Sequence, residues 1–349
     1  MPHLWASLQL SVPDNRLPQL AAWLDKKGPT IRSLTFNFQL QKGDWPALAA
    51  ALQPLTWLTC LRLTDDGDRE WRVSPIRLRR LALRSLRRLE VDTSGYVVVQ
   101  ADLLLCDSLE SMHISSDCRV AYVNSPPSLA RLSMPLRAER LGEVVWDCAF
   151  RASVPGLREL QLFCSWSDRA MFHFRMMMDR APGGNIEGAL LSLAELGDLA
   201  PGLEALAIDC SQASLQCEGG DRIELGLADA PQLPKGLRSL TVTQLGFSSY
   251  DFLQGLSALL HLTQLCLPKC HLHGVPRALE GLTQLEEVQL SGCISDVVGR
   301  TLAPLRALPC LRRLSLAGCD LRGLAAEELV LEGWPALQEL DLAFAKVPG

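Results

Sequence analysis

Apolar side chains recur along this chain in a short pattern, L-x-x-L-x-L, which is found twelve times with conservative replacements. The twelve copies open at Ile31, Leu58, Leu86, Leu109, Leu129, Leu157, Leu203, Leu237, Leu262, Leu285, Leu311 and Leu337. Most steps between copies are 20 to 34 residues long, and one, after Leu157, is 46. Because a strand turns alternate side chains to opposite faces, the last two apolar positions of each copy share one face. The pattern therefore predicts one short strand per copy, with its leucines turned inward.

No single copy can bury its own leucines, so the copies must stack on one another. The three copies that open at Leu262, Leu285 and Leu311 extend to L-x-x-L-x-L-x-x-C, ending at Cys270, Cys293 and Cys319. On these residues the chain resembles the leucine-rich-repeat family over about residues 31–345. The resemblance implies an α/β fold, a leucine-rich-repeat solenoid or curved horseshoe of about twelve repeats. Parallel strands would line its concave face, helices or short strands its convex face. In that family the Asn or Cys position points inward and its side chain can bond to the backbone.

The segments that return from one predicted strand to the next differ along the chain. Apolar residues have helical spacing at 251–260, 274–283, 297–308 and 323–333, whereas 96–100, 119–123 and 221–225 are β-rich. We therefore expect helical backs in the C-terminal third and short strands on the back in the middle. Residues 165–200 predict an irregular insertion or a degenerate repeat. The stretch IRLRRLALRSLRRLEV offers two registers, opening at Leu78 or Leu86, and Leu86 keeps the spacing.

The first 30 residues do not fit the repeat and predict an N-terminal cap, with a strand followed by a helix around 15–27. This stretch resembles the junction after the F-box in plant-type F-box/leucine-rich-repeat proteins, through Leu4, Trp5, Trp23 and Leu24. In that family the F-box holds the ubiquitin-ligase scaffold and the repeats hold the substrate. The helices of the F-box itself would lie upstream and are absent from the given chain.

Composition narrows the class of protein. The chain of 349 residues holds 69 leucines, is 48% hydrophobic and 21% charged, and so can bury a large core. Its net charge of −5 argues against a nucleic-acid binder. The first residues lack the pattern of a signal peptide. No apolar stretch is long enough for a membrane helix. The twelve cysteines are spread along the chain without paired spacing. We expect an intracellular protein with reduced thiols and no membrane partner, cytoplasmic or, alternatively, nuclear or attached to the cytoskeleton or axoneme.

Candidate binding residues follow from the outward positions of the repeat, the third, fifth and seventh. The predicted partner-binding residues on the concave face are Arg62, Arg88, Glu90, Asp92, His113, Arg131, Gln161 and Phe163. Glu90, His113 and Ser133 occupy the fifth position of consecutive copies and have the composition of a catalytic triad. An open strand ladder supplies no obvious oxyanion donors or water exclusion, so we expect a polar recognition surface and no enzyme.

Three other clusters have two interpretations each. Cys266, Cys270, His271 and His273 suggest zinc, but strand alternation sends Cys266 to solvent and Cys270 to the core, so we expect no metal and no cofactor. Eight arginines within residues 69–88 form a solvated face or a patch for an acidic protein, or alternatively for RNA. The aromatic group Phe163, Trp166, Phe172, His173 and Phe174 either anchors a partner or packs the insertion.

The sequence thus predicts a non-catalytic protein–protein interaction module that recognises a substrate or partner in an F-box-type ubiquitin ligase. An adaptor of that ligase would bind only through an upstream F-box. Two alternatives remain: a cytoskeletal or axonemal scaffold, and a GTPase-activating repeat protein.

Overall fold

The computed structural model describes residues 7–13, 17–27, 30–39, 50–65, 76–79, 81–93, 98–115, 118–138, 144–145, 154–166, 190–192, 196–212, 215–216, 222–223, 226–227, 233–244, 255–270, 275–293, 301–325 and 333–347. The chain divides into two units. The first unit comprises Met1–Leu136 with Asp147–Leu160, and the second Arg137–Trp146 with Gln161–Gly349. The sequence-based division into a cap over 1–30 and a solenoid over 31–345 stays a prediction.

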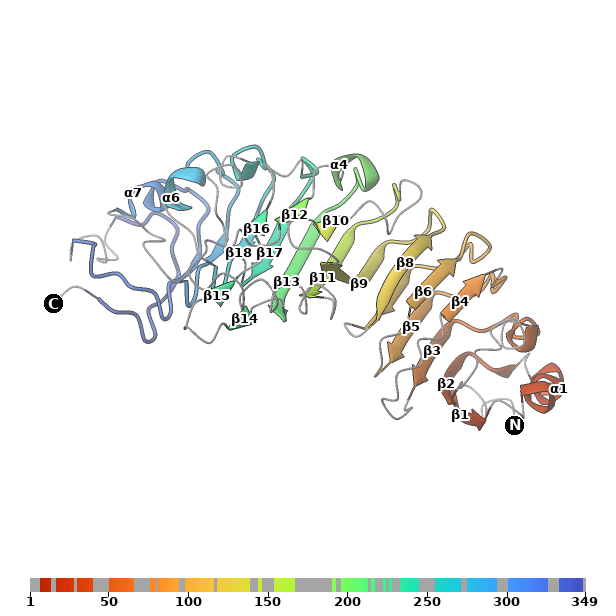
Figure 1. Cartoon of the computed structure of the whole chain (residues 1–349). Coiled ribbons are helices and arrows are strands. Elements are labelled where there is room, and N and C mark those ends of the chain that lie inside the picture. Colours follow the sequence, from red (N-terminus) through yellow and green to blue (C-terminus); the bar gives the residue numbers. More distant parts are fainter. Residues whose placement is uncertain are drawn as a thin grey trace. The chain divides into compact units, whose positions relative to one another are not determined.

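The first unit is built on a parallel sheet (Figure 1). Its strands, in spatial order, are β1 (Ser7–Pro13), β2 (Ser33–Gln39), β3 (Cys60–Asp65), β5 (Arg88–Thr93), β7 (Ser111–Ile114) and β9 (Arg131–Ala138). The strands β2 to β9 follow the first five copies of the leucine pattern, so the strand predicted for each is present. The predicted N-terminal strand and helix are β1 and α1 (Leu17–Lys27), which contact each other.

One backbone carbonyl per repeat sets the register of this sheet. Two successive N–H groups, those of Thr59 and Cys60, donate to the carbonyl of Arg32. The same pair of bonds recurs at each later step, from β3 to β11, at N···O distances between 2.7 and 3.1 Å. The acceptors after Arg32 are the carbonyls of Thr59, Arg87, Glu110 and Ala130. As a result, residues at equal positions in the repeat lie beside each other on neighbouring strands.

The inward positions of these strands form a continuous leucine ladder. Leu34, Leu61 and Leu89 are fully buried in adjacent strands, and Met112 and Leu132 continue the row with at most 2% of their surface exposed. Burying a leucine side chain removes apolar surface worth about 1.5–3 kcal/mol from water. The core of the unit therefore runs along the stack rather than lying within any single repeat.

A second, smaller parallel sheet lies on the return segments of the first unit. Its strands are β4 (Ile76–Arg79), β6 (Val98–Asp102) and β8 (Arg119–Asn124). The β-rich segments at 96–100 and 119–123 thus form strands as predicted. The register that opens at Leu86 is also confirmed, because β5 follows Leu86 and pairs with β3, whereas Leu78 belongs to β4.

The second unit is built on the same backbone plan. Its parallel strands are β13 (Ala205–Gln212), β17 (Ser239–Thr243), β18 (Gln264–Cys266), β19 (Glu287–Gln289), β20 (Arg313–Ser315) and β21 (Glu339–Asp341). Each again follows a copy of the pattern, and the shared-carbonyl bonds recur between 2.7 and 3.1 Å. The boundary between the units falls within β9 and within β11 (Glu159–Trp166).

The return segments of the second unit hold short elements. The helices are α4 (Leu196–Leu199), α6 (Val275–Ala278) and α7 (Ala303–Arg306), and Figure 1 shows α6 and α7 side by side. The small strands are β10 (Val144–Val145), β12 (Leu190–Ser192), β14 (Leu215–Gln216), β15 (Arg222–Ile223) and β16 (Gly226–Leu227).

The helical backs predicted for 274–283 and 297–308 are present as single turns, α6 and α7. At α7 the Thr301 hydroxyl accepts the N–H of Ala303, and Pro304 lies in the first turn. Most of the predicted insertion at 165–200 and parts of 251–260 and 323–333 lie outside the described residues. No helix that the structure describes has the length and apolar character to cross a membrane.

The turn after each of the last five strands, β17 to β21, uses a left-handed backbone. The eighth position of five successive repeats has φ between 56° and 71°. The five residues are Gln244, Lys269, Gly292, Gly318 and Phe344. In the first four, the N–H donates to a carbonyl of the next repeat, as from Gly292 to Ala317. A side chain is disfavoured in this conformation, and two of the five positions are glycine.

Replacing Gly292 by alanine should therefore destabilise the second unit by about 1 kcal/mol, because the new Cβ is held in the left-handed region. Gly281→Ala is the matched control, since its Cβ would meet nothing within 4 Å and its φ lies outside that region. Urea unfolding followed by circular dichroism measures both. Equal midpoints for the two variants would contradict the role of the turn.

Candidate functional site

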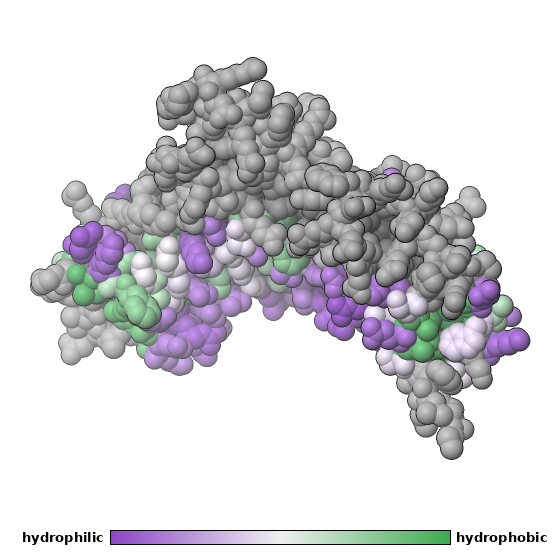
Figure 2. All heavy atoms as spheres, turned by 60° about the horizontal axis from the view of Figure 1, so that its bottom comes forward, coloured by the Kyte–Doolittle hydropathy of each residue, from purple (hydrophilic) through white to green (hydrophobic). Residues whose placement is uncertain are grey.

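The outward side chains of β2, β3, β5, β7 and β9, which we call the strand face, form columns across the first unit. Burial alternates along the strands: in β7, Met112 and Ile114 are buried, and Ser111 and His113 are half-buried. Figure 2 brings the bottom of Figure 1 forward and shows hydrophilic residues gathered on that side of each unit. The repeat thus turns its apolar residues inward and its polar residues toward solvent.

Six of the eight predicted binding residues lie on adjacent strands of this face. They are Arg62, Arg88, Glu90, Asp92, His113 and Arg131. The register places Arg62 beside Glu90 and Glu90 beside His113. The other two predicted residues, Gln161 and Phe163, lie on the part of β11 that belongs to the second unit. Gln161 is exposed and Phe163 is half-buried.

Arg62 is the centre of an ion-pair network on the strand face. Its Nη2 donates to Oδ2 of Asp92 at 2.6 Å, and its Nε lies 3.7 Å from Oε2 of Glu90. The hydrogen bond to Asp92 raises the pKa of Arg62 above its ordinary value. Arg88 contacts Glu90 from the other side, at 3.8 Å through Nε. Pairs this exposed add about 0–1 kcal/mol to stability, so they contribute little to holding the fold.

The residues with triad composition are brought together, but the acid is engaged elsewhere. Nδ1 of His113 lies 3.0 Å from Oγ of Ser133, within hydrogen-bond distance. The carboxylate of Glu90 instead faces two arginines, Arg62 and Arg88, one at each oxygen. The strand N–H groups around Ser133 belong to the sheet ladder, which leaves the main chain there committed to the fold. The arrangement suits a polar contact surface better than acyl transfer.

The arginine-rich stretch at 69–88 is divided between different parts of the first unit. Arg77 and Arg79 lie on β4 in the small back sheet, whereas Arg88 lies on β5 in the main sheet. Arg87 is exposed next to β5 and pairs with Glu110 at 3.4 Å. Arg69, Arg72 and Arg80 lie outside the described residues. The described arginines therefore do not form one continuous basic patch.

The predicted aromatic cluster is only partly described. Phe163 lies on β11, and Trp166 ends that strand. Phe172, His173 and Phe174 lie outside the described residues, so whether they bind a partner or pack an insertion stays a prediction.

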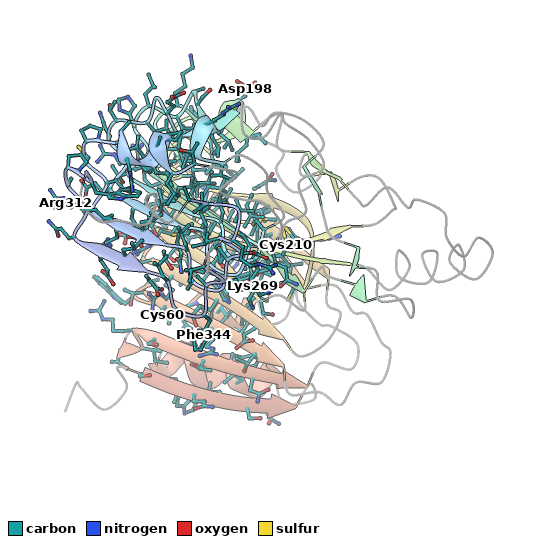
Figure 3. The ribbon with its side chains drawn as sticks, turned by 90° about the vertical axis from the view of Figure 1, so that its left-hand side faces the viewer. Cys60, Asp198, Cys210, Lys269, Arg312 and Phe344 are labelled. Atoms are coloured by element: carbon teal, nitrogen blue, oxygen red, sulfur yellow. The ribbon has the colours of Figure 1, made fainter. Side chains whose placement is uncertain are left out.

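The outward face of the second unit carries a hydrogen-bonded polar network that the sequence analysis did not single out. Nη2 and Nε of Arg313 donate to Oε2 of Glu287 at 2.5 and 3.2 Å. The Ser315 hydroxyl donates to Oδ2 of Asp341 at 2.9 Å and lies 2.9 Å from the Ser291 hydroxyl. The signal was available, because these residues occupy the same outward positions as those of the first unit. Figure 3 shows the neighbouring Arg312 projecting away from the strands.

Cys266 departs from the prediction for its position. It was expected on the solvent side, yet only 6% of its surface is exposed. It lies in register between Thr241 on β17 and Gln289 on β19. Cys266 thus acts as a packed residue despite its outward position.

The repeat cysteines bond to backbone in the way the family resemblance implied. The thiols of Cys270, Cys293 and Cys319 donate to carbonyls of the preceding repeat at 3.0 to 3.2 Å. The acceptors are the carbonyls of Val242, Leu267 and Leu290. Each bond ties the residue that follows a turn to the end of the neighbouring strand. The zinc hypothesis also needed His271 and His273, which lie outside the described residues.

Burial makes these thiols poor nucleophiles and poor metal ligands. It raises the pKa of Cys293 and of Cys319, so the thiolate form is scarce near neutral pH. The pKa of Cys210 is raised as well, first by its interaction with the neighbouring Cys164 thiol and then by burial. Figure 3 shows Cys210 among packed side chains. None of the cysteines that the structure describes is in a disulfide, and Cys310 is exposed.

Comparison with known proteins supports the fold alone. No protein-family model and no curated protein sequence matches the chain. Among solved structures, the complex of TLR13 with ssRNA13 matches 99% of this chain with a TM-score of 0.56 and 16% identity. The fold is a leucine-rich-repeat solenoid. The match covers 48% of the TLR13 chain, so this chain spans about half of that protein's length. A leucine-rich-repeat protein of Leptospira interrogans matches 99% of this chain and 85% of its own, at 15% identity and a TM-score of 0.42.

The burial of the Cys270, Cys293 and Cys319 thiols predicts selective alkylation. Iodoacetamide at neutral pH should modify Cys310 in the folded chain and should modify Cys293 only after denaturation, because the buried thiol is held against Leu267. Mass spectrometry of the digested protein reads both sites, and Cys310→Ser serves as the control. Equal labelling of the two cysteines in the folded chain would show that the Cys293 thiol is open to solvent.

Proposed function

We propose that this chain is a non-catalytic recognition module that binds a protein partner through the strand face of its first unit. The observation that carries the proposal is the row of charged side chains on adjacent strands, from Arg62 through Glu90 and Arg88 to Arg131, held in register by the shared carbonyls. A rigid backbone that presents polar side chains at fixed spacing costs little entropy on binding. This arrangement supports specificity through charge complementarity.

Mixed charge favours a protein partner over a nucleic acid. Arginines alternate with acidic side chains on the strand face, and Arg62 and Arg88 both contact Glu90. A phosphodiester chain laid along the columns would meet Glu90 and Asp92 as well as the arginines. The solved neighbour TLR13 is in complex with ssRNA13, but at 16% identity that ligand does not extend to this chain.

We further propose that the partner is the substrate of an F-box-type ubiquitin ligase, in the cytoplasm. Support comes from the N-terminal resemblance: Trp23 and Leu24 lie on α1, half-buried and buried, directly before the first repeat. Leu4 and Trp5, the other residues of that resemblance, lie outside the described residues. In such a ligase the F-box would hold the scaffold and the repeats would present the substrate.

Reversing two charges on the strand face should abolish partner binding. In the Arg88→Glu, Arg131→Glu variant each guanidinium becomes a carboxylate, so acidic groups of the partner would be repelled instead of attracted. We expect recovery of the partner from native cell lysate to fall at least tenfold, measured by quantitative mass spectrometry. Arg277→Glu is the control, because Arg277 is exposed on α6, in a return segment of the second unit. Unchanged recovery with the double variant would refute the strand face as the binding surface.

The identity of the co-purified proteins tests the ligase context separately. Affinity purification of the tagged chain should recover a candidate substrate whose cellular half-life shortens when the chain is overproduced in its F-box-fused form. Recovery of tubulin or axonemal proteins, unaffected by Arg88→Glu, Arg131→Glu, would instead support a structural scaffold. Stimulated GTP hydrolysis by a co-purified GTPase would support the activator alternative.

A further inference from the structure

Two arginines on the strand face flank a short serine in one column. Arg88 on β5 pairs in register with Ser111 on β7, and Ser111 pairs with Arg131 on β9. Adjacent strands lie about 4.8 Å apart, so the two arginine backbones are separated by about 10 Å. Both guanidinium groups stand on long flexible stems, and the serine between them is small. The column therefore has a basic side chain on each side of a small hydroxyl-bearing one.

The hydrogen-bonding groups of this column are available. Among the residues that the structure describes, neither the Arg131 guanidinium nor the Ser111 hydroxyl has a side-chain partner. Arg88 has one contact, at 3.8 Å through Nε to Glu90, which is longer than a hydrogen bond. Both arginines are exposed, and 58% of the Arg88 side chain is open to solvent. Donors arranged in this way, two guanidinium forks and a hydroxyl, match the oxygens of a phosphate.

The surroundings limit the ligand to a single compact anion. Glu90 lies next to the column, in contact with Arg88. Glu159 follows Arg131 in the same column, because its N–H donates to Ala130 just as that of Arg131 donates to Glu110. Carboxylates on two sides would repel a continuous polyanion but leave room for one dianion between the arginines. They would also attract basic residues that flank that dianion.

We propose that Arg88, Ser111 and Arg131 clamp the phosphate of a phosphorylated serine or threonine in the protein partner. The proposal rests on the function proposed above and names the chemistry of the partner. A phosphoserine carries a charge of about −1.5 to −2 and three acceptor oxygens near neutral pH. Each arginine donates a forked pair of hydrogen bonds, Ser111 donates one from below, and the partner's basic residues contact Glu90 and Glu159. Phosphorylation of the partner then switches recognition on.

The test uses fluorescein-labelled degenerate peptides with a central phosphoserine, and the same library with serine in its place. Fluorescence polarisation with the full chain should show at least tenfold tighter binding of the phosphorylated library. Arg88→Gln and Arg131→Gln should each weaken that binding about tenfold or more, as expected for loss of a charged hydrogen-bond donor. Arg87→Gln is the matched control, since Arg87 is exposed next to Arg88 and already pairs with Glu110.

A second pair of variants tests the Ser111 position between the two arginines. Ser111→Glu places a carboxylate between the arginines and should block the phosphorylated library. Ser33→Glu, in the same column at β2, should not. Circular dichroism and the urea midpoint of each variant establish that it is folded. Equal binding of the two libraries, or equal loss with Arg87→Gln and Arg88→Gln, would overturn the clamp.

Two further outcomes separate the clamp from the function it rests on. If phosphatase treatment of the lysate leaves capture of the partner unchanged while Arg88→Glu, Arg131→Glu abolishes it, the strand face binds a partner and the phosphate clamp is wrong. If neither the treatment nor the double variant affects capture, both proposals fail. Binding of oligouridylate RNA that depends on Arg88 and Arg131 would replace the clamp with a nucleic-acid surface.

Discussion

The structure of each unit depends on one shared hydrogen-bond acceptor per repeat. A single carbonyl takes two successive N–H groups from the next repeat, as that of Arg238 does from Thr263 and Gln264. This bond pair uses only main-chain atoms, so it holds whatever the side chains are. It fixes the stacking distance and the register together, and the leucine ladder then fills the space that the register leaves on the inner side. Everything presented on the outer side inherits its spacing from this contact.

The turns that follow β18, β19 and β20 add further bonds between repeats. The left-handed residue sends its N–H to the next repeat, and the thiol one position later bonds back to the preceding one, as at Gly292 and Cys293. Each of these three repeats is thereby bonded to the repeat before it and to the repeat after it. A thiol is a weak donor, and its burial here is stabilised as much by packing as by the bond it makes.

Much of the fold follows from the sequence because the leucine period is a direct record of strand alternation. Twelve copies of the pattern correspond to twelve strands, β1 adds one before them, and even the ambiguous Leu86 register was decided correctly by spacing. The candidate site was predictable to the level of columns, since outward positions can be counted. Counting positions cannot predict which side chains meet, because that depends on side-chain length and rotamer. Arg62 bonds to Asp92 as well as lying near Glu90. Cys266 is buried although its position is outward.

The main-chain origin of the register also has a consequence for how such a protein changes over time. Exposed ion pairs at outward positions add only about 0–1 kcal/mol each to stability, so the fold constrains these positions weakly. Inward residues need only remain apolar and of suitable volume. Main-chain contacts therefore allow the same fold with different side chains, consistent with a fold shared at 16% identity over 99% of this chain. In this architecture the outward side chains can change while the backbone that sets their spacing stays the same.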